Sequence, residues 1–111
     1  MVRAISAMAL LAALSSSAAG APHSITIING TGAPLRDVAA KPEKGGSWDS
    51  LTPGLSPGAK TGVSVDPDLC AYEVKATAAG ATLTWRGVNL CETSSVTLNR
   101  RADGTLWVDY D

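Results

Sequence analysis

The stretch Cys70–Cys91, CAYEVKATAAGATLTWRGVNLC, decides the fold of this chain. Two runs rich in β-branched and aromatic residues flank a short Ala/Gly segment, a pattern that is typical of a β-hairpin. Apolar and polar side chains alternate in both runs, so one face of the hairpin should pack on a core while the other meets water. A cysteine stands at each open end of the hairpin.

Two registers of this hairpin agree with the sequence. A two-residue turn on 80–81 places the two cysteines directly opposite each other. A four-residue loop over 78–81 instead pairs Glu73 with Arg86, and it moves the second cysteine one pair beyond the partner of the first. Both registers bring the sulfurs close, and the spacing is far from Cys-x-x-Cys, so we predict a structural disulfide between Cys70 and Cys91. It would contribute about 3 kcal/mol by restricting the unfolded chain.

Residues 1–21 have the features of an export signal. Arg3 supplies the positive charge, 4–14 is an apolar run, and 15–21 provides small residues for a signal peptidase. The apolar run is too short to span a bilayer. We therefore predict a cleaved signal peptide and no membrane anchor.

The position of the cleavage remains open between two bonds. Cleavage after Ala19 satisfies the small-x-small rule. Cleavage after Ala21 also satisfies it but places Pro22 directly behind the cut, which is unfavourable. Either way we expect a single domain over 22–111, located in the periplasm or secreted, where a disulfide persists.

Short alternating runs separated by turn residues fill the rest of the chain. Beyond the hairpin, we expect strands over 24–29, 35–39, 60–65, 95–100 and 105–110. The alternation lapses between 41 and 60, where we predict a loop. The total of about seven short antiparallel strands predicts an all-β fold, a small β-sandwich that is Ig-like in outline and holds one disulfide.

Turn chemistry marks three of the connections. Asn29-Gly30 ends the first strand, Pro57-Gly58 suits a type II turn, and 101–104 is a strong hairpin turn signal. Residues 29–31 also match a glycosylation sequon, but Asn-Gly is first of all a turn.

Several landmarks occur together in this chain. They are Asn29–Gly32, Trp48-Asp49, Leu55–Gly58, Cys70–Glu73 and Trp85–Cys91, followed by a closing hairpin. In this combination the sequence resembles a group of small exported proteobacterial proteins, and the Trp-x-Gly-x-Asn-Leu-Cys segment is the most specific part. The likeness covers most of the mature chain. It implies an all-β fold and an exported location, and it carries no catalytic residue over to this chain.

Charge and histidine content argue against two classes of function. The formal net charge is −1, and loss of Arg3 with the signal makes it one unit more negative. No basic stripe typical of a nucleic-acid binder is present. The single histidine, His23, leaves no Ser-His-Asp or Cys-His arrangement. We therefore predict that the protein is not an enzyme, uses no cofactor and does not bind nucleic acid.

The predicted loop over 41–60 contains the first candidate site. Its apolar residues Trp48 and Leu51 either pin the loop over one end of the core or form an exposed binding tip with Asp49. Our leading prediction is a monomeric, non-catalytic module that binds a protein or an envelope component through its loops. Trp48, Asp49 and Leu51 are the candidate contact residues, and the tip at 101–104 is the second candidate surface.

The alternative prediction is a calcium-dependent or small-ligand-binding protein. Asp66 and Asp68 are weak candidate calcium ligands, because Asp-Pro-Asp is also ordinary turn chemistry. Trp85 and Trp107 stand at strand positions, and we expect them in the core rather than at a ligand site.

Overall fold

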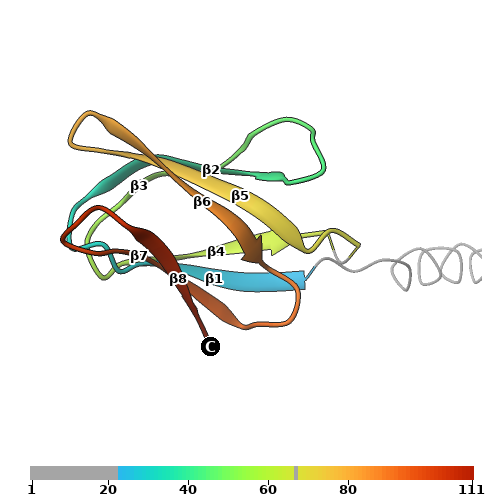
Figure 1. Ribbon diagram of the computed structural model, residues 1–111. Coiled ribbons are helices and arrows are strands. Elements are labelled where there is room, and N and C mark those ends of the chain that lie inside the picture. The colour runs from blue at the N-terminus through green and yellow to red at the C-terminus, as the bar shows by residue number, and fades with distance from the viewer. Residues whose placement is uncertain (1–22, 67) are drawn as a thin grey trace, which may run out of the picture.

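The computed structural model describes residues 23–66 and 68–111, which form eight strands in two four-stranded sheets that lie face to face (Figure 1). The first sheet has the order β4-β1-β7-β8, with β1 at His23–Asn29, β4 at Lys60–Val65, β7 at Ser95–Arg100 and β8 at Leu106–Tyr110. The second has the order β3-β2-β5-β6, with β2 at Leu35–Pro42, β3 at Asp49–Leu55, β5 at Ala71–Ala78 and β6 at Ala81–Asn89. The predicted export signal and its cleavage point lie outside the described residues.

The prediction of an all-β sandwich with one disulfide is confirmed, with one additional strand. The prediction of a loop throughout 41–60 is wrong, because β3 lies within that range. β3 pairs with β2 alone and is therefore an edge strand, a position in which a proline such as Pro53 is tolerated. All strand pairs are antiparallel except β1 and β7, which run parallel.

The core lies between the sheets and is built from alternate residues of both. Its largest fully buried apolar side chains are Trp85, Ile27, Leu35, Leu90, Leu98, Val38, Val74, Val88 and Val96. Trp85 was expected there, and its indole N–H also donates a hydrogen bond to the Asn99 carbonyl (3.0 Å). The same expectation for Trp107 is wrong. Its side chain is 39% exposed, and the Arg101 guanidinium lies 5.4 Å from the ring centroid.

The hairpin adopts the register in which Val74 lies opposite Trp85, the second of the two predicted alternatives. The connection is shorter than the four-residue loop, because Ala78 also pairs with Ala81. The two central residues, Ala79 and Gly80, have φ of 49° and 82°, as a type I′ turn requires.

The disulfide closes the open end of this hairpin. A shift of register between Tyr72 and Val74 brings the ends of β5 and β6 into the pairing Ala71 with Asn89. Cys70 precedes Ala71, and Cys91 follows Asn89 by two residues; their Cα atoms are 5.0 Å apart and their sulfurs are bonded. A disulfide of this kind is expected in an oxidising compartment.

The three predicted turns are present. In the second, Ala59 donates its backbone N–H to the Ser56 carbonyl (2.9 Å), and Gly58 has the positive φ (78°) of a type II turn. The first turn depends on Asn29, whose side chain is fully buried and hydrogen-bonded. Because this amide is enclosed in the fold, the sequon at 29–31 is closed to modification in the folded protein.

Candidate functional site

The outer side of the second sheet carries a group of basic residues. On β5, Glu73, Lys75 and Thr77 alternate with buried residues and point away from the core. Register then places Lys41 opposite Glu73 and Arg36 opposite Thr77, so these β2 residues share the same outer side. We call Arg36, Lys41, Lys75 and Arg86 the basic face. Glu73 lies among them, and Asp37 is exposed beside Arg36 in the irregular part of β2.

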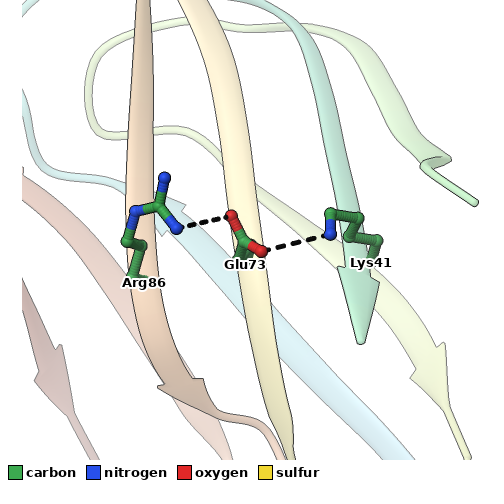
Figure 2. Close-up of polar contacts among 3 residues, drawn as sticks. All are labelled: Lys41, Glu73 and Arg86. Atoms are coloured by element: carbon green, nitrogen blue, oxygen red, sulfur yellow. Dashed lines mark ion pairs between the residues drawn. The ribbon is translucent and has the colours of Figure 1, made fainter. Parts of the chain in front are cut away.

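Glu73 organises two members of the basic face. One carboxylate oxygen lies 3.2 Å from Lys41 Nζ, and the other lies 3.3 Å from Arg86 Nη1 (Figure 2). The three residues come from the neighbouring strands β2, β5 and β6 (Figure 2). Only 12% of the Glu73 side chain is exposed, whereas Arg86 is 73% exposed. One carboxylate therefore holds two cations in place and neutralises only one of them.

Trp48 lies on the same outer side. Its ring is half-buried, and the ammonium groups of Lys75 and Lys41 lie 4.3 Å and 5.5 Å from the ring centroid. It is not part of the apolar core cluster. The negative face of an indole ring attracts a nearby ammonium, so Trp48 positions the two lysines rather than closing one end of the core.

Asp49 and Leu51 point elsewhere, although they follow Trp48 in sequence. Leu51 packs against the core, and both residues line a cavity of about 270 Å³. The same cavity is lined by Ser64, near the end of β4, and by Asp66, which follows that strand. The structure thus separates Trp48 from Asp49 and Leu51, and it joins these two with Asp66.

We call this cavity the edge cleft, because it lies where the edge strands β3 and β4 of the two sheets approach each other. Tyr72 also lines it. Burial raises the pKa of the Tyr72 hydroxyl, and the negative charges of Asp66 and Asp49 act in the same direction. A hydrogen bond with the Asp66 backbone opposes this rise. The hydroxyl is therefore neutral at physiological pH.

Asp66 and Asp68 do not form a joint metal site. The Asp66 carboxylate accepts a hydrogen bond from the Asp68 backbone N–H (2.9 Å), as in an ordinary Asx turn. Asp68 lines a different hollow, of about 110 Å³, beside Glu43 and Lys44. Within 23–66 and 68–111, no three His, Cys, Asp or Glu residues are grouped closely enough to hold a metal ion.

Sequence reasoning missed Tyr72 and Lys75 as members of candidate sites. The alternation along β5 assigns Tyr72 to the inner face and Lys75 to the outer face, and both assignments are correct. Their neighbours at the two sites come from β2, β3, β4 and the loop before β3, and no local sequence pattern predicts how these segments lie together. The second candidate surface, the tip at 101–104, is a hydrogen-bonded turn whose Arg101 stacks on Trp107.

Comparison with known proteins adds support for the fold. No protein-family model matches the chain, and no curated protein matches it in sequence. A protein from Eubacterium rectale, whose structure was determined by NMR, is similar in structure with a TM-score of 0.62. The two are 16% identical, and the match covers 80% of this chain and 87% of the other. At this identity the likeness concerns the fold alone.

The part of the chain that the structure describes includes no helix long and apolar enough to cross a membrane.

Proposed function

We propose that this protein is an exported, non-catalytic β-sandwich module that binds a negatively charged protein or envelope component. The contact surface is the basic face together with Trp48. The location, in the periplasm or outside the cell, is supported by the signal features of residues 1–21 and by the disulfide.

The arrangement of Lys75 carries this proposal. Its ammonium group lies 4.3 Å from the centroid of the Trp48 ring and has no carboxylate partner among the described residues. Arg36, on the neighbouring strand, likewise makes no ion pair within the described part of the chain. Because Trp48 holds the Lys75 ammonium in place without a counter-charge, Lys75 loses little side-chain freedom when an anion binds.

The chain as a whole is slightly acidic, so a local group of basic residues indicates the charge of a partner that binds there. The whole sequence has one more acidic than basic residue, yet four basic residues gather on one sheet surface, where Glu73 is the acidic residue that pairs with two of them. Complementary charge directs encounter with an anionic partner and disfavours a cationic one. The basic face therefore supports an acidic partner more strongly than an uncharged one.

Charge removal on the basic face tests the proposal. We expect Lys75→Gln to weaken binding to soluble dextran sulfate, measured by calorimetry at low salt, by about two- to fivefold. Trp48→Ala should weaken it similarly because the lysines lose their support, while Tm changes little because Trp48 lies outside the core. The same variants should capture less partner from an envelope extract.

Lys60→Gln is the matched control. Lys60 lies on β4 in the other sheet and is exposed, so its removal changes the net charge equally without touching the basic face. If Lys60→Gln and Lys75→Gln weaken binding to the same extent, the effect is one of net charge and the proposal fails. A large drop in Tm for Trp48→Ala would likewise show that Trp48 is a structural residue.

A further inference from the structure

The edge cleft is a second surface feature, built from residues other than those of the basic face. Its volume of about 270 Å³ is near the lower limit for small-molecule pockets. Six apolar residues form most of its lining, namely Ala40, Pro42, Leu51, Val65, Leu69 and Leu90. A lining of this kind favours a compact ligand with an apolar body.

Two carboxylates give the cleft its charge. Asp49 begins β3 in one sheet, and Asp66 follows β4 in the other, so both sheets contribute a negative charge. Neither carboxylate takes part in an ion pair with any described residue. Both also act on the Tyr72 hydroxyl, which places that hydroxyl within the field of the two charges.

Apolar lining and unpaired negative charge together limit the class of ligand. An anion would be repelled by Asp49 and Asp66. A calcium ion requires six to eight oxygen ligands, which a mostly aliphatic lining does not provide. An organic ammonium satisfies both features, because its hydrocarbon part can cover the aliphatic lining while its charged nitrogen meets the carboxylates.

We infer that the edge cleft binds a small organic cation, a primary amine carried on a short apolar body, with Asp49 and Asp66 as the charge-recognition residues. The inference does not depend on the proposed function, since the basic face lies on the outer side of the sheet and uses different residues.

Titration of the purified protein with benzylamine, followed by amide NMR, tests the inference. We expect saturable shifts that concentrate on the cleft residues Leu51, Leu69 and Tyr72. Benzyl alcohol has nearly the same shape but no charge, and it should bind at least about threefold more weakly. Equal affinity for the two probes, shifts scattered over the surface, or no shift at millimolar benzylamine would overturn the inference.

Charge-neutral variants assign the effect to residues. Asp49→Asn and Asp66→Asn should each weaken benzylamine binding by about threefold, and Asp66→Asn keeps the oxygen that accepts the Asp68 N–H. Asp109→Asn, on the exposed side of β8, is the matched control and should not change the affinity. Lys75→Gln should also leave it unchanged, which separates this test from that of the basic face. Equal losses in the cleft variants and in Asp109→Asn would refute the assignment.

Discussion

At the scale of single residues, Asn29 is the polar side chain that is buried within the described part of the chain. Its amide nitrogen donates hydrogen bonds to the carbonyls of Ala33 (2.7 Å) and Leu55 (2.8 Å). Its amide oxygen accepts from the backbone N–H and the hydroxyl of Thr31. One buried side chain thus connects the end of β1 to the following turn and to the end of β3.

We predict that Asn29→Asp destabilises the protein by about 3 kcal/mol or more. The substitution keeps the shape, but it places a carboxylate oxygen against two carbonyl oxygens and buries a charge without a cation. Urea unfolding measures the loss. Burial raises the pKa of the introduced carboxyl group in the folded state, so the deficit should narrow as the pH falls towards 4, where the protonated group regains one donor and loses its charge.

Asn99→Asp provides the comparison. It makes the same chemical change at a half-buried position, where the amide nitrogen donates one hydrogen bond to the Thr97 carbonyl (3.3 Å). We expect a loss of about 1 kcal/mol or less there. Similar losses at the two positions would contradict the structural role assigned to Asn29.

At the scale of elements, the type I′ turn of the hairpin requires a left-handed backbone at position 79, where the chain has an alanine. Ala79 has φ of 49°, in the left-handed region that costs a non-glycine residue about 1–2 kcal/mol. Asparagine tolerates this region, and Asn-Gly is the preferred pair for a type I′ turn. We therefore predict that Ala79→Asn raises the free energy of unfolding by about 0.5–1 kcal/mol, measured by urea denaturation.

The same substitution two residues later should not help. Ala81 is exposed and begins β6, where asparagine has a poor strand propensity. Ala81→Asn should therefore be neutral or slightly destabilising. A gain at Ala81 equal to that at Ala79 would show that the turn geometry is not the cause.

This turn also explains why the register could not be predicted. Turn chemistry favours a turn centred on 80–81, with Gly80 at its first central position. In the protein the turn is centred one residue earlier, with Ala79 first and Gly80 second. The strands around the turn were predictable because apolar and polar residues alternate along them. β3 was not, because Pro53 and Gly54 interrupt its pattern, and an edge strand can tolerate both.

At the scale of the whole molecule, the candidate sites depend on contacts between segments that are distant in sequence. Asp49, Leu51 and Asp66 were each candidates from the sequence, but for different functions. They line one cleft only because β3 and β4, the edge strands of different sheets, lie side by side. The packing of the two sheets brings β3 next to β4, and no local pattern in the sequence predicts this contact.

The disulfide stabilises the end of the molecule that contains the edge cleft. Leu69 precedes Cys70, Leu90 precedes Cys91, and both leucines line the cleft. The bond joins residues 21 apart in sequence, so it restricts the unfolded chain by about 3 kcal/mol. That is a large share of the total stability of about 5–13 kcal/mol typical of a domain of this length.

We therefore predict that Cys70→Ala combined with Cys91→Ala lowers Tm by about 12–24 °C, measured by calorimetry. A reductant should lower the Tm of the native protein by a similar amount and leave that of the double variant unchanged, because the variant has no bond to break. If the native protein melts at the same temperature with and without reductant, the disulfide does not contribute to stability. The apolar core between the two sheets would then be sufficient to hold the domain folded.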